Sequence, residues 1–155
     1  MDLILWRHAE ALDASESGGD LERALSKRGE KQALRMAQWL DRQLLEGTRI
    51  LCSPARRTEQ TALVLGRKYK LRPELAPGGG VDELLALARW PDGKSAVLVV
   101  GHQPVLGQTI ARLLGLAESD CAVRKGALWW LRSRQRGAQG HLETVVLTVQ
   151  SPETL

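Results

Sequence analysis

The sequence predicts one α/β domain over residues 1–155, built as three layers (α/β/α) around a mostly parallel sheet. A chain of this length is too short for two full domains. Its composition, 43% hydrophobic and 26% charged residues, is that of a globular protein with a substantial core. Short apolar runs alternate with segments of helical spacing, and this alternation is typical of connected β-α units.

The N-terminal part predicts a strand, a loop and a long helix. Residues 3–6 (LILW) form a short apolar run, as in a buried parallel strand. Residues 11–25 are polar and contain glycine, and we interpret them as a loop. Ser26 is a candidate N-cap for a helix to about residue 46, which Gly47 is placed to end.

A second strand and helix are expected next. Residues 49–52 (RILC) have the character of a strand. Ser53 is predicted to cap the following helix and Pro54 to occupy its first position, where the missing N–H costs nothing. We expect this helix to run to about residue 68, and residues 71–76 to form a short strand.

The second half of the chain continues the alternation and adds two late strands. The expected elements are a glycine loop at 78–80, a helix around 84–87, a strand at 96–100, a helix from about 104 to 113, and strands at 127–131 and 143–149.

Three of the predicted strands end in candidate catalytic or ligand-binding residues. In open α/β sheets, ligands bind at the carboxyl ends of the strands. Two of the chain's three histidines therefore fall at the same edge. The three groups are Arg7-His8, Ser53 with Arg56 and Arg57, and Gly101-His102.

These residue types together predict a phosphoryl-transfer site that needs no metal. Arginine binds phosphate oxygens through its forked donors. A neutral imidazole is a competent nucleophile toward phosphorus, and nearby cations disfavour its protonated form. The helix start after Ser53 adds backbone amides that attract an anion.

The charge of the chain is positive, with a formal net charge of +4 and an isoelectric point near 9.4. Basic residues cluster at 67–72 and 132–136, but acidic residues are spread through the rest of the chain. No basic stripe interleaved with aromatics and no zinc-finger spacing is present. We therefore favour an anionic substrate or an acidic partner over nucleic acid.

The chain has no sequence feature of a secreted or membrane protein. Its two cysteines, Cys52 and Cys121, make no disulfide framework. No apolar run approaches the roughly 20 residues that span a bilayer, and the N-terminus lacks a signal-peptide pattern. We expect a cytoplasmic protein that does not act on membranes.

Four segments of the sequence have the character of functional motifs and follow one another in a recognisable order. They are LWRHAEA at 5–11, LSKRG at 25–29, SPARRTEQTA at 53–62 and VVGHQP at 99–104. Together they resemble the motifs of the histidine phosphatase superfamily, the phosphoglycerate mutase-like fold. The short length and the RHAEA start are most similar to SixA-type phosphohistidine phosphatases.

The resemblance implies a role for each matching residue. It makes His8 the nucleophile, Arg7 and Arg57 the phosphate-binding arginines, and His102 the second histidine of the site, with no cofactor. Ala9 stands where most of the superfamily has glycine, and we expect this to be tolerated unless the backbone there requires a positive φ.

The chain lacks the long insertion that supplies substrate contacts and an acidic proton donor in the mutases and larger phosphatases. An open site of this kind can admit a phosphohistidine on a protein, either a histidine phosphotransfer domain or a phosphocarrier.

We expect the protein to be a monomer. We also expect Ser26 and Glu10 to contact the substrate. Glu10, Asp82 and Glu83 are the candidate proton donors, although an imidazole can leave a phosphoramidate without one.

Three other functions are compatible with these residues. A phosphatase of small phosphoesters would use the same groups, whereas a mutase is disfavoured because it needs a lid. A non-catalytic phosphoprotein-binding module would not require the nucleophile.

Two motifs of other protein classes are incomplete in this chain. Cys52 and Arg57 nearly match the phosphate-binding loop of cysteine phosphatases, but their spacing is one residue short. The glycines at Gly78–Gly80 are not followed by the lysine of a P-loop.

Overall fold

The computed structural model describes all residues, 1–155, and contains one six-stranded sheet with the order β3-β2-β4-β1-β5-β6. The strands are β1 (Asp2–Arg7), β2 (Arg49–Cys52), β3 (Lys70–Leu71), β4 (Val97–Gly101), β5 (Leu128–Arg136) and β6 (His141–Gln150). The four strands from β3 to β1 are parallel, and β5 and β6 add antiparallel pairings at one edge.

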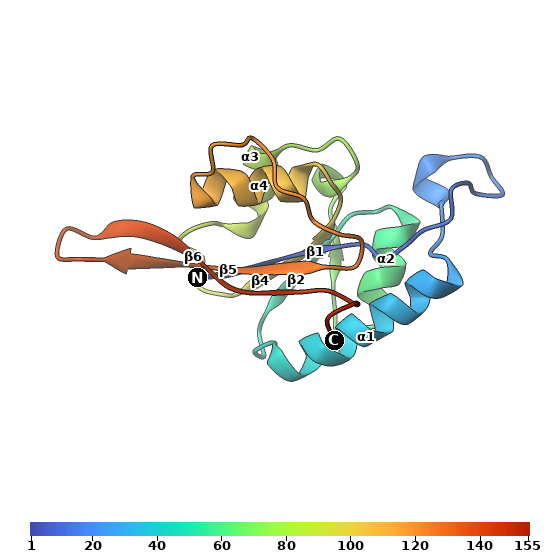
Figure 1. Cartoon of the computed structure of the whole chain (residues 1–155), viewed down its shortest axis with the longest axis horizontal. Coiled ribbons are helices and arrows are strands. Elements are labelled where there is room, and N and C mark those ends of the chain that lie inside the picture. Colours follow the sequence, from blue (N-terminus) through green and yellow to red (C-terminus); the bar gives the residue numbers. More distant parts are fainter.

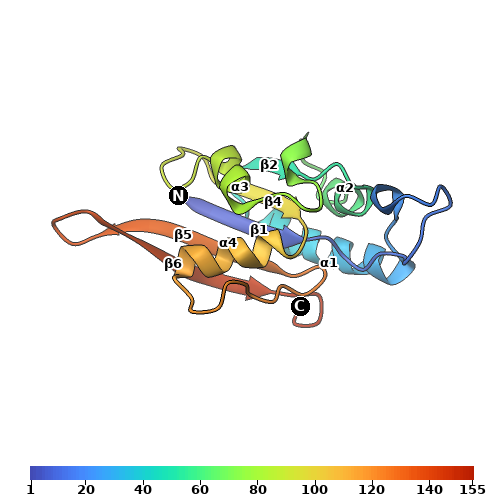
Figure 2. The same cartoon turned by 90° about the horizontal axis from the view of Figure 1, so that it is seen from above.

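Helices cover both faces of this sheet, which confirms the predicted three-layer α/β/α class (Figure 1). The helices α1 and α2 lie on one face, and α3 and α4 lie on the other (Figures 1 and 2). Their bounds are α1 (Lys27–Gln43), α2 (Arg56–Leu63), α3 (Val81–Ala88) and α4 (Val105–Leu114), with 3₁₀ turns η1 (Asp20–Glu22) and η2 (Pro73–Leu75).

Each face of the sheet has its own hydrophobic core. Side chains alternate along β1, so that Leu3 and Leu5 pack beneath α3 and α4 whereas Ile4 and Trp6 pack beneath α1 and α2. All four of these side chains are fully buried, because helices cover both sides of the central strands. The central position of β1 therefore holds its carboxyl end rigidly.

The helix boundaries differ from the predicted ones. The second helix begins at Arg56, with Ala55 as its N-cap, so the expectation that Ser53 and Pro54 open it was wrong. It ends at Leu63 rather than near residue 68, and α1 ends at Gln43, before the predicted stop at Gly47. Ser26 is the N-cap of α1 as expected, and its hydroxyl accepts a hydrogen bond from the Gly29 N–H.

Strand lengths were predicted less well than strand positions. The strand expected at 71–76 is only Lys70–Leu71, because Pro73 cannot donate to a ladder and instead starts η2. The two late strands are longer than expected, and they form a hairpin that projects beyond the sheet (Figures 1 and 2).

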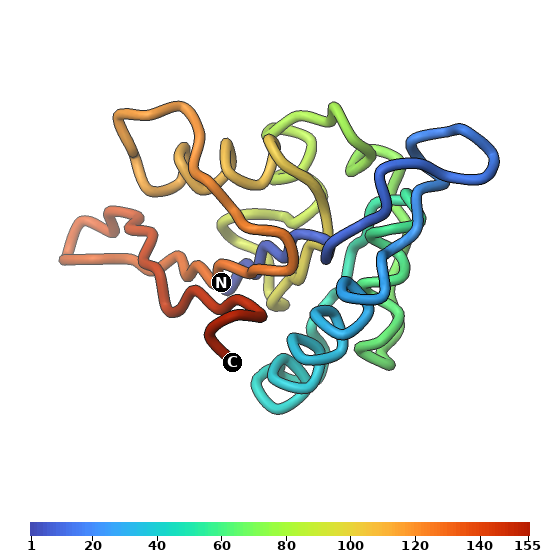
Figure 3. The backbone as a smooth tube through the Cα atoms, turned by 45° about the vertical axis from the view of Figure 1, so that its right-hand side comes forward, coloured from blue at the N-terminus to red at the C-terminus, as the bar shows by residue number.

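The C-terminal residues return to the first helix. Figure 3 shows the last turn of the chain beside α1, and Arg35 of α1 donates a hydrogen bond of 3.1 Å to the Pro152 carbonyl. None of the helices has the length and hydrophobicity needed to cross a membrane.

Candidate active site

The carboxyl end of β1 lies at the centre of the site. The His8 N–H donates to the Gly101 carbonyl at the end of β4 (3.2 Å), and the His8 carbonyl accepts from the Gly126 N–H (2.8 Å). These two bonds hold His8 between the strand that leads to His102 and the loop that precedes β5. The backbone of His8 is therefore fixed by partners far away in the sequence.

The His8 ring has a defined orientation. Its Nδ1 lies 2.7 Å from the Ala9 carbonyl oxygen, which can only accept a hydrogen bond. In the neutral ring Nδ1 must then carry the proton, and Nε2 keeps its lone pair. Burial, reinforced by the charges of Arg57, Arg7 and Lys125, lowers the pKa of His8 to about 4 although its bond to Ala9 opposes the shift. The His8 imidazole is thus neutral and oriented at physiological pH.

His102 faces His8 across the site. The two ring centroids are 5.3 Å apart, and the rings are tilted by 55°. His102 Nε2 lies 2.7 Å from the Ser53 hydroxyl, and both residues are buried. Burial, with the neighbouring His8 and Arg57, lowers the pKa of His102 to about 3. Ser53 therefore orients the second histidine.

Arg57 lies in the first turn of α2 and is 5% exposed. Its Nη1 donates to the backbone carbonyl of Asp20 (2.9 Å), and its Nη2 donates to the Asp20 carboxylate (3.1 Å). The neighbouring Arg56 is exposed.

Arg7 approaches the site from the end of β1. Its Nη1 donates to the Val123 carbonyl at 2.8 Å, which anchors the guanidinium against the segment that precedes β5. Its Nε is buried and has no hydrogen-bond partner in the protein. A buried donor of this kind is costly unless a ligand satisfies it.

These side chains line a small open pocket of about 160 Å³ that has no hydrophobic lining. The lining residues are Arg7, His8, Arg23, Arg57, Pro77, His102, Gln103 and Lys125. Two neutral imidazoles and four cationic side chains are suited to a compact dianion such as a phosphoryl group.

The chain is similar in sequence and structure to known proteins. A family described as the histidine phosphatase superfamily (branch 1) matches residues 3–78. Phosphohistidine phosphatase SixA of Escherichia coli (strain K12) is 35% identical over 121 residues, 73% of this chain and 74% of that protein. The chain belongs to the histidine phosphatase superfamily.

Two further comparisons extend over nearly the whole of this histidine phosphatase. An uncharacterized protein of Picosynechococcus sp. is 33% identical over 163 residues, covering 100% of this chain and 99% of that protein. The solved structure of the protein histidine phosphatase SixA complexed with tungstate is 28% identical, with a TM-score of 0.75 over 98% of this chain and 97% of that one.

Three neighbours of the site in this histidine phosphatase were missed in the sequence analysis: Arg23 and Lys125 line the pocket, and Asp20 pairs with Arg57. Ser53 was expected at this edge as a helix cap, whereas its hydroxyl contacts His102. Arg23 lies two residues before the LSKRG motif, so its position was a usable signal. Asp20 lies in the short 3₁₀ turn η1 and Lys125 in the turn before β5, and neither segment has a periodic sequence pattern.

Ser26 and Glu10 are near the pocket but do not line it. The Ser26 hydroxyl caps α1 and donates to the Glu10 carboxylate at 3.0 Å. Asp82 pairs with Arg112 on the surface, and Glu83 is exposed. None of the three candidate proton donors lines this pocket, and the pKa of the paired Asp20 is held below its usual value by Arg23 and Arg57.

The remaining sequence interpretations concern Ala9, Cys52 and metal binding. Ala9 is buried and does not have a positive φ, so alanine fits this position without strain. Burial raises the pKa of Cys52 to about 12, which leaves it a protonated core residue rather than a nucleophile. No group of three or more His, Cys, Asp or Glu side chains is arranged to hold a metal ion.

Proposed function

We propose that this chain is a phosphohistidine phosphatase that removes the phosphoryl group from a histidine of another protein through a covalent phospho-His8 intermediate. One observation carries the proposal. The bond from His8 Nδ1 to the Ala9 carbonyl leaves the Nε2 lone pair free, in a pocket that contains Arg7 and Arg57.

In the first step, His8 Nε2 attacks phosphorus in line with the leaving group. A bond forms between Nε2 and phosphorus, and the P–N bond of the substrate breaks. Arg7, Arg57 and His102 stabilise the equatorial oxygens, so that catalysis rests on positioning and electrostatics. The departing imidazole takes its proton from solvent.

In the second step, water attacks the phosphorus of phospho-His8. The P–Nε2 bond breaks, inorganic phosphate leaves and neutral His8 is restored. The low pKa of His8 supports this cycle because the imidazole is ready for the next attack without first losing a proton.

The shape and polarity of the pocket support a protein substrate. About 160 Å³ with no hydrophobic lining accommodates a phosphoryl group but offers little apolar contact to a sugar ring or a base. The SixA relative is named a phosphohistidine phosphatase, and a SixA structure holds tungstate, a tetrahedral oxyanion. A histidine phosphotransfer domain or a phosphocarrier is the class of partner that we propose.

Trapping of labelled phosphate on the protein tests the mechanism. After brief reaction with a ³²P-phosphohistidine protein and an alkaline quench, the wild-type chain should carry label and His8→Ala should carry none. An exposed histidine provides the matched control, since His141→Ala should trap as much label as the wild type. Label that persists in His8→Ala would contradict the assignment of His8 as the nucleophile.

A competition assay tests the substrate class. A phosphohistidine protein, a phosphotyrosine peptide and a sugar phosphate are offered at equal concentration, and we expect the phosphohistidine protein to be turned over fastest. Preference for the sugar phosphate would favour the small-molecule phosphatase. Binding without turnover of any substrate would favour the non-catalytic module.

A further inference from the structure

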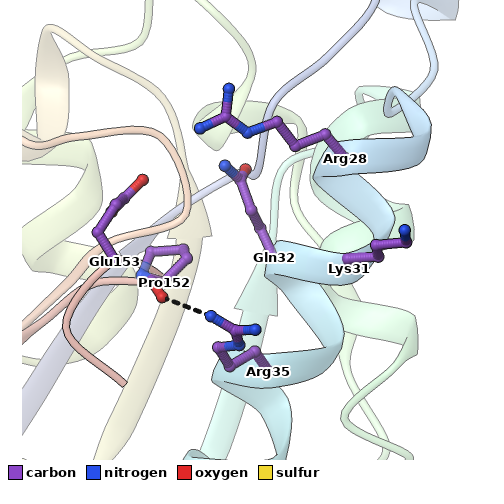
Figure 4. A pocket seen from close by; sticks show the side chains of 6 residues that line it. All are labelled: Arg28, Lys31, Gln32, Arg35, Pro152 and Glu153. Carbon is purple, nitrogen blue, oxygen red and sulfur yellow. Dashed lines mark hydrogen bonds between the residues drawn. The ribbon is translucent and has the colours of Figure 1, made fainter.

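One face of α1 carries a row of cationic side chains outside the catalytic pocket. Arg28, Lys31, Gln32 and Arg35 are spaced i, i+3, i+4 and i+7, so they share one side of the helix. With the C-terminal turn they line a second pocket of about 250 Å³, whose lining residues are polar or charged except for Pro152. Figure 4 shows Arg28, Gln32 and Arg35 directed from α1 toward that turn.

The positive charge of this basic face (Arg28, Lys31 and Arg35) is poorly compensated within the chain. Lys31 makes no ion pair, and Arg28 reaches only the Glu10 carboxylate, at 3.8 Å. Arg35 donates one N–H to the Pro152 carbonyl. Glu153 is the single carboxylate among the lining residues. Exposed cations at this density attract an anionic surface.

The basic face lies next to the catalytic pocket. Lys125 lines the catalytic pocket, and the adjacent Gly126 donates its N–H to the His8 carbonyl. Gly126 also packs against Pro152, where an added β-carbon would come within 2.9 Å of the proline ring. Because Pro152 lines the second pocket, a single loop separates the two sites, and one partner can cover both.

We propose that the basic face of α1 docks an acidic surface of the phosphohistidine protein, beside the histidine that enters the catalytic pocket. This inference rests on the proposed function. The small catalytic pocket, of about 160 Å³, offers contacts to little beyond the phosphoryl group, so affinity for a protein must come from surface outside it. Charge complementarity of this kind acts mainly on the rate of encounter and is weakened by salt.

The basic face is better suited to a protein than to a nucleic acid. Gln32 accepts a hydrogen bond from the Glu10 N–H, and the Glu10 and Glu153 carboxylates stand among the cations. A continuous phosphate backbone would be repelled by these two carboxylates, whereas a protein surface can place its own polar groups opposite them.

Substitution of Lys31 tests the proposal because this side chain has no partner to lose. We expect Lys31→Glu to lower kcat/KM for an acidic histidine phosphotransfer domain phosphorylated on histidine by about fivefold at low salt, through KM. Adding Arg28→Gln should bring the loss to about tenfold or more. Phosphoramidate, which touches only the catalytic pocket, should be hydrolysed at the wild-type rate by both variants.

A charge change at the other end of the sheet is the matched control. Lys94 is exposed, unpaired and close to the start of β4, so Lys94→Glu alters the net charge equally but leaves the basic face intact. It should change kcat/KM for the phosphorylated domain by less than twofold. Thermal unfolding of all variants verifies that they are folded.

The outcomes separate this inference from the proposed function. If Lys31→Glu and Lys94→Glu have equal effects, the docking surface is wrong while phosphohistidine hydrolysis stands. If the wild type does not hydrolyse phosphohistidine in any protein, the proposed function is wrong, and the docking inference that rests on it is wrong as well. Loss of oligonucleotide binding in Lys31→Glu with unchanged protein turnover would assign the face to nucleic acid and overturn the proposal.

Discussion

Arg57 is held twice by Asp20, once by its backbone carbonyl at 2.9 Å and once by its carboxylate at 3.1 Å. The same carboxylate accepts a hydrogen bond of 3.0 Å from Arg23, which also lines the pocket. Arg57 is almost completely buried, whereas the Asp20 side chain is 55% exposed. The carboxylate therefore stands at the rim and occupies donors that the proposed phosphoryl substrate would use.

We predict that Asp20→Asn strengthens the binding of inorganic phosphate severalfold. The substitution removes a negative charge that competes with the dianion, and the backbone carbonyl continues to hold Arg57 Nη1. Product inhibition of phosphoramidate hydrolysis measures the effect. Weaker inhibition would mean that the carboxylate is needed chiefly to position Arg57.

We predict that Glu10→Gln, Asp82→Asn and Glu83→Gln each leave phosphohistidine turnover nearly unchanged. None of these carboxyl groups lines the pocket, and a departing imidazole needs no dedicated acid. Alkyl phosphates should be poor substrates, because protonation of an alkoxide leaving group is typically worth ~10²–10⁴-fold. A hundredfold loss in any one variant, on that same scale, would reveal a proton donor.

The two buried histidines predict a loss of stability in mild acid. Below pH 6.5 the unfolded chain takes up protons that folded His8, with a pKa of about 4, does not. The free energy of unfolding should therefore be highest above pH 6.5 and should fall between pH 6.5 and pH 4. The fall due to His8 alone should be about 3 kcal/mol.

Urea unfolding at pH 7, 5.5 and 4.5 measures this decline. His102→Gln removes one of the two groups and should flatten the pH dependence, because His102 has a folded pKa of about 3. His141→Gln, at an exposed position in the hairpin, is the comparison. Curves of equal slope for wild type and His102→Gln would contradict the prediction.

Gly29→Ala should lower both stability and activity. A β-carbon at Gly29 would overlap the backbone carbonyl of Glu10, so α1 and the chain that follows His8 would have to separate. We expect a loss of about 1–3 kcal/mol in the free energy of unfolding and a fall in kcat.

Gly19→Ala is the matched substitution for that experiment. Gly19 has a φ of −91°, and an added β-carbon would meet only the Glu22 side chain, at 3.7 Å. Stability and kcat should stay close to wild type, and equal losses in both variants would show that close packing at Gly29 is unimportant.

The sequence by itself was sufficient for the fold class and for the central residues of the candidate site. Apolar runs of strand length and a helix with a buried stripe are local patterns, and they predicted β1, β2, β4 and α1. Parallel strands place their carboxyl ends at one edge. This rule alone brought His8 and His102 together, and the structure places their rings 5.3 Å apart.

Only the tertiary structure decided how these residues are held. Ser53 is a good helix cap by type, yet the pairing of β2 with β4 puts its hydroxyl against His102, and α2 begins three residues later. Asp20 and Lys125 reach the site from the 3₁₀ turn η1 and from the turn before β5, and such short connections have no periodicity that predicts their position. Long-range contacts of this kind depend on how the layers pack, and local sequence does not encode them.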